Sequence, residues 1–305
     1  MARRAGATSH EFGGQHTDLK LSVVEDYLHA YTKALRGKFS KLWYVDAFAG
    51  TGSRTVRTVL DGSDLLELPP IEQIDVRRGS AQIALDTRPA FDFVVFIEQN
   101  PRYVSELNDL TARYLQRCTN VISEDANTAL KSLVKTNSWD DKRAVVFLDP
   151  YGMEVEWSTL QALASTRAID VWFLFPLAGL FRQATRKLTD IDQTKRAALI
   201  RMFGDDAWER ELYPESKIDD LFGGAQERRR LADVRGLENY ARARLKTIFG
   251  EVFLPLPLPI ESGPQRFSLF LCVSNTEPTA IGLASRIAKN LLDPKRHLIK
   301  GSASK

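Results

Sequence analysis

The stretch "YVDAFAGTGS", residues 44–53, leads from apolar, aromatic and β-branched residues into two glycines separated by one residue. Residues 42–48 have the composition of a short β-strand, with Asp46 close to its end. Gly50 and Gly52 can adopt positive φ and let the backbone approach a ligand closely. A lone Gly-x-Gly pair is a weak signal and is more often only a turn. Its meaning therefore depends on the neighbouring strands.

Alternating strands and helices surround this turn. Periodicity predicts strands at 91–97, 120–123, 144–148 and 169–175, helices at 104–115, 128–134 and 157–164, and an amphipathic helix at 16–36 that Gly37 ends. The strands are nearly continuous apolar runs, as expected when helices cover both sheet faces. The alternation predicts an α/β fold with a mostly parallel, doubly wound sheet in a single domain, residues 1–305.

Two segments interrupt the alternation. Residues 54–78 hold several Gly, Ser and Pro residues without a sustained period, so we predict a long loop, followed by a helix with Ser80 as its N-cap. Residues 178–250 are rich in charge and contain helical stretches at 195–203 and 235–249. We predict that 178–250 is a helical insertion within the domain that selects a substrate or partner.

The end of the chain predicts an edge strand, a last strand and a closing helix. Pro255, Pro257 and Pro259 occupy every second position, so their missing N–H groups fall along one edge of an extended chain. Such a segment suits only an edge strand. A strand at 266–275 and a helix at 280–292 follow.

Acidic residues follow four successive predicted strands: Asp46, Glu98, Asp125 and Asp149. In an open parallel sheet, ligands bind beyond the carboxyl ends of the strands. Each of these acids would have a binding role if the cofactor were S-adenosylmethionine. Glu98 can accept from both ribose hydroxyls and Asp125 from the adenine amine. Asp46 and Asp149 would lie near the sulfonium cation, with Gly50 and Gly52 at the amino-acid and ribose moieties.

Other cofactors fit this pattern less well. The NAD fingerprint has three glycines leading directly into a helix, whereas the next helix here is expected only near Ser80. The chain lacks the Gly-Lys-Ser/Thr of a Walker loop.

Composition sets broad limits. The chain is 305 residues long, 44% hydrophobic, and has only two cysteines, Cys118 and Cys272, too few for a disulfide framework or a zinc site of its own. No apolar run approaches the ~20 residues of a membrane span. The first residues lack the apolar core of a secretion signal. We expect a cytoplasmic protein without membrane contact. Residues 286–305 hold six Lys or Arg against one Asp, which allows nucleic-acid contact but also suits a solvated helix face.

The motif order Asp-x-Phe-x-Gly-x-Gly followed by Asp-Pro-Tyr-Gly resembles that of class I amino-methyltransferases. More closely, the chain resembles the three-Cys-motif partner protein (TcmP) family, in the segments "HTDLKLSVVEDYLHAY", "YVDAFAGTG", "GSAQIAL", "FIEQNP", "FLDPYG" and "VWFLFP". The resemblance implies a Rossmann-like sheet with strand order 3-2-1-4-5-7-6. It also implies that Phe48 lies with the cofactor-binding residues, and that a partner protein supplies the three cysteines.

Two further motifs concern the substrate. "HTDLK", residues 16–20, resembles a segment of rRNA adenine-N6 methyltransferases in which His and Lys reach the active site, which implies roles for His16 and Lys20. A helix cap and a solvated lysine are an equally good interpretation. The adenine enzymes carry Asp-Pro-Pro-aromatic. Here Asp149 and Pro150 are followed directly by Tyr151, one position early, so stacking by Tyr151 is plausible, whereas the missing proline counts against an adenine target.

Two hypotheses follow. The first is an S-adenosylmethionine-dependent N-methyltransferase acting on an amine, with a nucleobase in nucleic acid as the favoured substrate. In it Asp149 holds the target amine while His16 or Lys20 steers the substrate or helps remove a proton. The alternative is a non-catalytic, methyltransferase-like module that binds a three-Cys-motif protein.

Overall fold

The computed structural model describes residues 11–12, 15–60, 71–215, 228–260 and 264–297, and for 11–12, 15–16, 53–60 and 71–77 the description is limited to the backbone. The last eight residues of the predicted basic tail lie outside it. Among the described helices, none combines the length and the apolar composition that crossing a membrane requires.

A central sheet organises the fold, and its strand order confirms the expected 3-2-1-4-5-7-6. From edge to edge the strands are β6 (Thr119–Ile122), β5 (Phe93–Ile97), β2 (Lys41–Asp46), β7 (Lys142–Leu148), β8 (Ile169–Phe175), β11 (Phe267–Val273) and β10 (Leu256–Leu258). The first five are parallel, whereas β11 is antiparallel to β8 and β10 to β11. The short strand β9 (Glu251–Val252) also pairs with β11. The predicted proline-rich edge strand is confirmed as β10, with Pro257 opposite Ser268.

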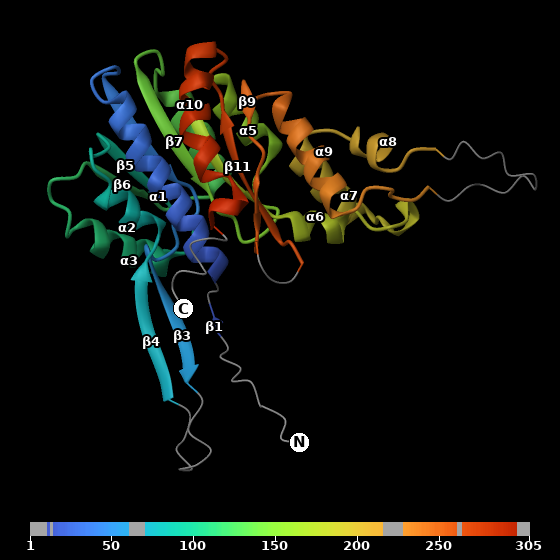
Figure 1. The fold of residues 1–305 in the computed structure, drawn as a ribbon, viewed down its shortest axis with the longest axis horizontal. Helices are drawn as coiled ribbons and strands as arrows, with labels where there is room; N and C mark the ends of the chain where they lie inside the picture. Colours follow the sequence, from blue (N-terminus) through green and yellow to red (C-terminus); the bar gives the residue numbers. More distant parts are fainter. Residues whose placement is uncertain (1–10, 13–14, 61–70, 216–227, 261–263, 298–305) are drawn as a thin grey trace, which may run out of the picture.

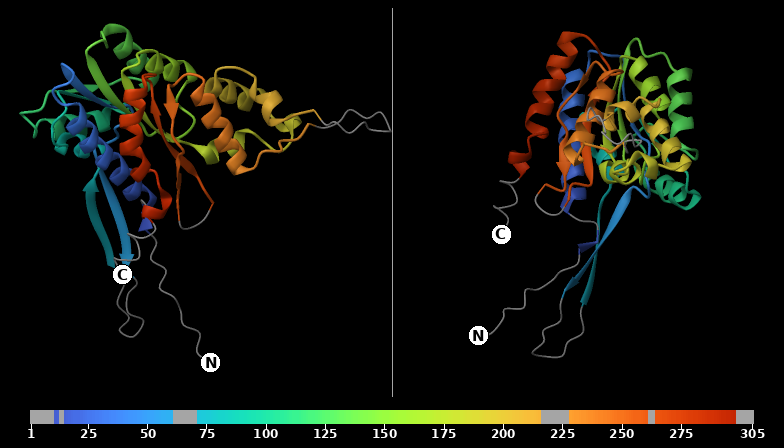
Figure 2. Two further views of the ribbon diagram at one scale, coloured as in Figure 1. Left: turned by 45° about the horizontal axis from the view of Figure 1, so that its top comes forward. Right: turned by 90° about the vertical axis from the view of Figure 1, so that its right-hand side faces the viewer.

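Helices cover both faces of the sheet, which explains the continuous apolar strands (Figure 2). One face packs against α1 (Gln15–Leu35), α2 (Ser80–Asp86), α3 (Pro101–Thr111) and α10 (Pro278–Leu291). The other packs against α4 (Ala126–Thr136), α5 (Trp157–Ser165) and the insertion. Adjacent residues therefore enter different cores: Tyr44 lies in the first and Val45 in the second, and both are fully buried.

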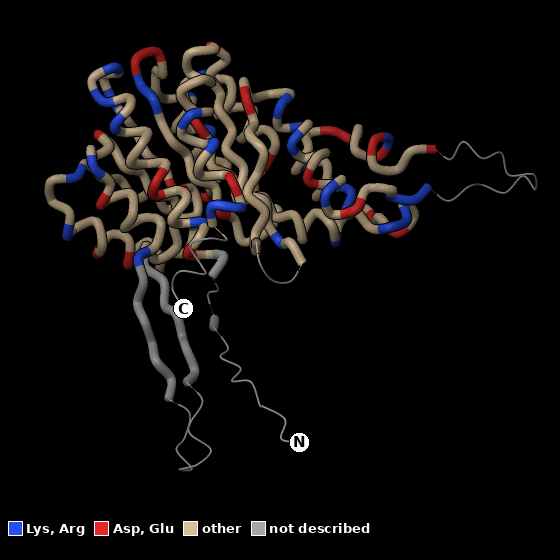
Figure 3. Tube along the Cα trace, in the orientation of Figure 1, with Lys and Arg blue, Asp and Glu red and all other residues tan. Residues whose placement is uncertain are grey.

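The segment after β8 is helical and extends to one side of the sheet (Figure 1). It contains α6 (Leu177–Gln183), a 3₁₀ turn (Leu188–Asp190), α7 (Gln193–Phe203), α8 (Trp208–Leu212) and α9 (Val234–Lys246). Two of its arginines hold this segment together: Arg228 donates to the carbonyls of Tyr213 and Glu209, and Arg230 to those of Ala184 and Ala232. Acidic and basic residues are interspersed along its described part (Figure 3), so charge there does not single out one kind of partner.

The loop predicted at 54–78 is wrong within the described residues. Strands β3 (Ser53–Leu60) and β4 (Ile71–Arg78) pair antiparallel along their full length, and β1 (Glu11–Phe12) pairs with β3. The ribbon projects from the body directly after the glycine turn (Figure 1). Cross-strand hydrogen bonds stabilise it, and apolar periodicity does not reveal these. The Gly and Pro residues that suggested a loop all lie in 61–70, outside the described residues.

The helix expected near Ser80 is confirmed as α2, but its N-cap is Gly79, not Ser80. Ser80 instead lies close enough to the buried Asp46 carboxyl to lower its pKa. Local capping rules do not consider such a neighbour.

Candidate functional site

The glycine turn leaves β2 with two residues in the left-handed region, Gly50 at φ 59° and Gly52 at φ 75°. A Cβ on Gly52 would lie 2.6 Å from Cδ2 of Leu110, so a side chain there would force Leu110 of α3 to shift. A Cβ on Gly50 would meet nothing within 4 Å, so this glycine borders open space. The first glycine is thus free for close approach by a ligand, and the second fixes the turn on the protein.

Glu98 holds the turn against the end of β5. Its Oε2 accepts a hydrogen bond from the Gly50 backbone N–H at 2.9 Å, and its Oε1 accepts from the Asn100 N–H at 2.8 Å. A carboxylate has about four acceptor positions. Glu98 can therefore position the turn and still accept hydrogen bonds from a ligand.

A cavity of about 380 Å³ lies beyond these strand ends. It is lined by Ala47, Phe48, Ile97, Glu98, Gln99, Glu124, Asp125, Ala126, Asn127, Tyr151, Glu154, Glu156 and Arg201. Five of these side chains are acidic and one is basic. The cavity is thus rich in hydrogen-bond acceptors and suited to a ligand with donors and positive charge.

Four predicted site residues line this cavity: Phe48, Glu98, Asp125 and Tyr151. Asp125 also caps α4, since its Oδ1 accepts from the Thr128 N–H at 3.0 Å. Tyr151 is 83% exposed, and this leaves its ring free to contact another molecule. Pro150, which lies between Asp149 and Tyr151 in the sequence, is buried.

Lys20 and Asp149 meet at the end of β7 as an ion pair between residues 129 positions apart in the chain. Their side chains are 9% and 26% exposed, so the pair is largely shielded from water but still reachable. The Lys20 ammonium also lies 5.9 Å from the ring centroid of Phe147. Helix α1 thus delivers Lys20 to the predicted catalytic carboxylate. His16 belongs to α1, but its side chain is outside the described part of the structure.

Asp46 ends β2 but does not line the cavity: it is fully buried. Its Oδ1 accepts from the Phe48 N–H at 3.3 Å. The pKa of the Asp46 carboxyl is raised to about 7, chiefly by burial and also by the charge of Asp149, while Ser80, the Phe48 N–H and Lys20 oppose the rise. Asp46 therefore stabilises the base of the turn, with one acidic neighbour in Asp149.

The raised pKa of Asp46 predicts a specific pH dependence of stability. The native state retains the Asp46 proton to about pH 7, whereas the unfolded chain releases it near pH 4, so this group's contribution falls as pH rises between these values. Asp46→Asn removes this titration. We therefore expect the free energy of unfolding of the variant, relative to that of the wild type, to increase as the pH is raised from 5 to 8, by up to about 1.4 kcal/mol per pH unit below pH 7. Urea unfolding at several pH values measures the difference. A constant difference would contradict the assignment.

Sequence reasoning assigned no role to several residues that build the cavity. Asn127 ties the start of α4 to the loop after β7: it donates to the Glu154 carbonyl and accepts from the Glu156 N–H and the Thr159 hydroxyl. Its place after the third strand was visible, but its partners were not. Arg201 comes from α7 in the helical segment after β8, and no local pattern links it to this cavity. Among the described residues, no group of three or more His, Cys, Asp or Glu is placed to hold a metal ion.

No family model matches the chain, and no curated protein matches it. One similar solved structure is the protein LPL1258 from Legionella pneumophila, of the family model DUF519. The two are 13% identical over 93% of this chain and 95% of that one, with a TM-score of 0.48.

Of two further similar structures, one contains S-adenosyl-L-methionine and the other is a carbon methyltransferase. Trm1 from Pyrococcus horikoshii, solved with S-adenosyl-L-methionine, is 12% identical over 83% of this chain and 55% of its own, with a TM-score of 0.41. The CurJ carbon methyltransferase is 12% identical over 83% and 54%, with a TM-score of 0.38. At such identities likeness concerns the backbone alone, and TM-scores below 0.5 support no function.

The class of fold is therefore defined by the chain's own topology. The sheet is mostly parallel and has the order 3-2-1-4-5-7-6, and β11, its last-but-one strand, runs antiparallel to β8. Together with helices on both faces, this topology is the Rossmann-like class I methyltransferase fold.

Proposed function

We propose that this protein is an S-adenosylmethionine-dependent N-methyltransferase that acts on an amine, with a nucleobase in nucleic acid as the substrate class. One arrangement supports the proposal above all: the acceptor-rich cavity beside the glycine turn lies next to the strand end that carries the Lys20–Asp149 pair.

The residues present fit this cofactor better than a phosphate-containing one. S-adenosylmethionine carries a sulfonium cation, amino groups and ribose hydroxyls, which match five carboxylates. The phosphates of a dinucleotide or nucleoside triphosphate would be repelled by the same acids. The glycine turn also leads into β3 and not into a helix, so it offers no helix N-terminus to a pyrophosphate.

Three parts of the chain would hold the cofactor. Glu98 would accept from the ribose hydroxyls, Asp125 from the adenine amine, and the open side of Gly50 would border the amino-acid portion. When bound, the cofactor supplies an electrophilic methyl group: the new nitrogen–carbon bond forms as the carbon–sulfur bond breaks, and sulfur keeps the electron pair.

Asp149 would act on the substrate by position. Its carboxylate can accept an N–H from the target amine and so orient the nitrogen lone pair, while Lys20 fixes that carboxylate. A strong base is not required, because the methylated nitrogen can lose its extra proton to water. The exposed ring of Tyr151 offers a stacking surface for a base.

Calorimetry with S-adenosylhomocysteine tests cofactor binding. We expect one site per chain, and we expect Glu98→Ala to weaken binding about 10- to 100-fold, because charge-assisted hydrogen bonds contribute about 1.5–3 kcal/mol. Glu106→Ala on α3, at an exposed i,i+4 pair with Arg102, is the matched control and should leave affinity within about twofold.

Absence of binding, or equal affinity in Glu98→Ala, would refute the proposed cofactor. Binding without methyl transfer to any amine would instead favour the non-catalytic alternative. In that alternative we propose a three-Cys-motif protein as the partner, on the sequence resemblance alone, with co-purification as its readout.

A further inference from the structure

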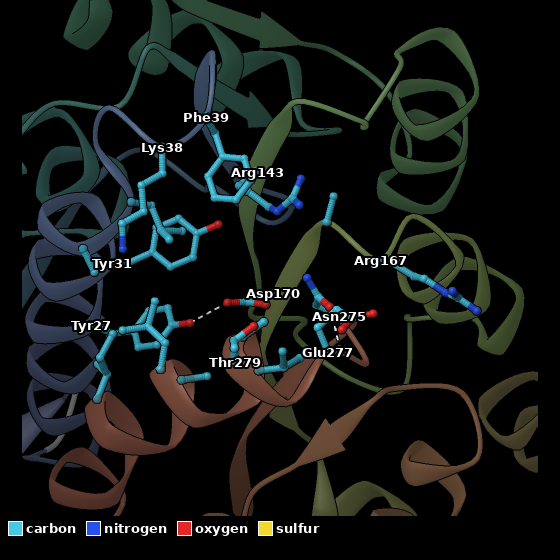
Figure 4. A pocket seen from close by; sticks show the side chains of 18 residues that line it. Tyr27, Tyr31, Lys38, Phe39, Arg143, Arg167, Asp170, Asn275, Glu277 and Thr279 are labelled. Carbon is cyan, nitrogen blue, oxygen red and sulfur yellow. Dashed lines mark hydrogen bonds between the residues drawn. The ribbon is translucent and has the colours of Figure 1, made fainter.

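A second cavity, of about 350 Å³, lies at the amino ends of the parallel strands, opposite the ends at which the candidate cofactor site lies. Its lining includes Arg143 near the start of β7 and Asp170 near the start of β8, whereas the cofactor cavity lies beyond the other ends of the parallel strands. Helices α1 and α10 form its two walls (Figure 4). Nothing in the proposed methyl transfer uses this cavity.

Both helices contribute aliphatic side chains to the lining of the cavity. Ala34 and Leu35 come from α1 and Leu283 and Ile287 from α10, and all four are only partly buried. An apolar body placed between the helices would remove this aliphatic surface from water, at about 25 cal/mol per Å². The walls therefore suit a flexible or flat apolar group.

The floor carries Asp170, which is enclosed by protein yet keeps some surface toward the cavity. Its Oδ2 accepts a hydrogen bond from the Tyr27 hydroxyl at 2.7 Å, the dashed line in Figure 4. Within the described residues, Oδ1 has no hydrogen-bond donor. Burial raises the pKa of the Asp170 carboxyl to about 7, against the effects of Tyr27 and Arg143. Oδ1 is therefore available to accept a hydrogen bond from a ligand in the cavity.

The charged and titratable groups around Asp170 come from every neighbouring element. They are Tyr27, Tyr31 and Lys38 from α1 and the turn after it, Arg143 from β7, Arg167 before β8, Cys272 from β11, and Glu277 at the start of α10. The three basic ones do not satisfy Oδ1. Arg143 donates to the carbonyls of Trp139, Asp140 and Lys142 and lies 4.0 Å from the ring centroid of Phe39.

The other two basic side chains are also directed elsewhere. Arg167 points away from Asp170 in Figure 4, and Lys38 is an exposed residue at the mouth. A ligand that reaches the floor therefore meets an acid whose Oδ1 can accept a hydrogen bond. An anionic or purely apolar group there would cover Oδ1 without offering it a donor.

We propose that this cavity binds a small organic amine, whose ammonium group donates to Asp170 while its aliphatic body lies between α1 and α10. The ammonium supplies the missing charge-assisted hydrogen bond, and the chain fills the aliphatic slot. This site is separate from the proposed cofactor site and does not depend on it.

Calorimetry on the full chain at pH 8 with three six-carbon probes tests the ligand class. We expect n-hexylamine to bind at one saturable site, and sodium hexanoate and 1-hexanol to bind at least about tenfold more weakly, since only the amine offers a cationic donor. Tighter binding of hexanoate, equal binding of hexanol, or no binding of hexylamine would each overturn the proposal.

Two substitutions locate the site. Asp170→Asn should weaken hexylamine binding at least about tenfold, whereas Glu277→Gln, an acid at the mouth of the same cavity, should change it less than about twofold. Ala34→Phe should block binding by filling the slot without touching Asp170, and thermal melts check that each variant folds. Unchanged binding in Asp170→Asn and Ala34→Phe, or an equal loss in Glu277→Gln, would contradict the assignment.

The pH dependence gives an independent readout. An alkylammonium stays charged to about pH 10, and the ligand binds the ionised form of Asp170. Affinity should therefore fall as pH is lowered through 7, approaching tenfold per pH unit below it, and this dependence should disappear in Asp170→Asn. A flat profile, or tighter binding at acid pH, would overturn the proposal.

Discussion

Asp149→Asn is expected to lower kcat/KM for methyl transfer about 1,000-fold and to leave S-adenosylhomocysteine affinity within about threefold. Asparagine keeps the shape of the side chain but replaces one acceptor oxygen by an amide donor that opposes the target N–H. It also removes the charge that pairs with Lys20. Cofactor binding should persist because Asp149 does not line the cofactor cavity. The measurement is transfer of labelled methyl groups from S-adenosylmethionine to nucleic acid from cells that lack the protein.

Asp109→Asn provides the matched control for this substitution. Asp109 is exposed on α3, away from the strand ends, so the same chemical change there should leave transfer within about twofold. Full activity in Asp149→Asn would remove Asp149 from the catalytic role, whereas the cofactor proposal would still depend on the calorimetry. Loss of cofactor binding together with activity would show that Asp149 acts through the binding site and not on the substrate.

Trp172→Ala should cost about 3–5 kcal/mol of the free energy of unfolding, the usual range for a large buried aromatic residue. Trp172 is fully buried in the middle of β8 and lies opposite Phe147 on one side and Leu271 on the other. Its ring makes an edge contact with Tyr27 of α1, with centroids 5.1 Å apart. Its loss would leave a cavity between α1 and the sheet centre. Urea unfolding followed by circular dichroism measures the change.

Leu115→Ala is the control for this experiment. Leu115 is also a large apolar residue, but it is 90% exposed, so its truncation should change stability by less than about 0.5 kcal/mol. Equal losses in the two variants would mean that Trp172 is not part of the packed core described here. Most proteins have only about 5–15 kcal/mol of stability, so the Trp172 variant is expected to unfold at a clearly lower urea concentration.

The main elements of the fold could be predicted because their signals are local. Apolar runs of strand length between helical periods predicted β5, β7 and β8 within two residues of their observed bounds. The alternating prolines identified β10 as an edge strand, since a missing N–H is a property of the residue itself. The acids at the strand ends could also be located, because parallel strands place their carboxyl ends at one edge.

Other features depend on residues that are distant in sequence. The ribbon of β3 and β4 is held by hydrogen bonds between strands whose side-chain pattern resembles a loop, so the prediction for 54–78 failed. Ser80 was predicted to be the N-cap of this helix, but Gly79 holds that position and Ser80 lies near the buried Asp46 carboxyl. The set of residues that line the cofactor cavity differs from the predicted set for the same reason. Asp46 is buried and does not line the cavity, whereas Arg201 reaches it from a separate helical segment.

The sequence by itself determined the order of strands and helices, the glycine turn after β2 and the acids that follow the strands. Only the tertiary structure decided what these residues do. The docking of α1 on the sheet joins Lys20 to Asp149, and its contact with α10 creates the cavity above Asp170. The physical reason is that burial and charge compensation depend on neighbours in space, whereas local sequence specifies only conformation and polarity.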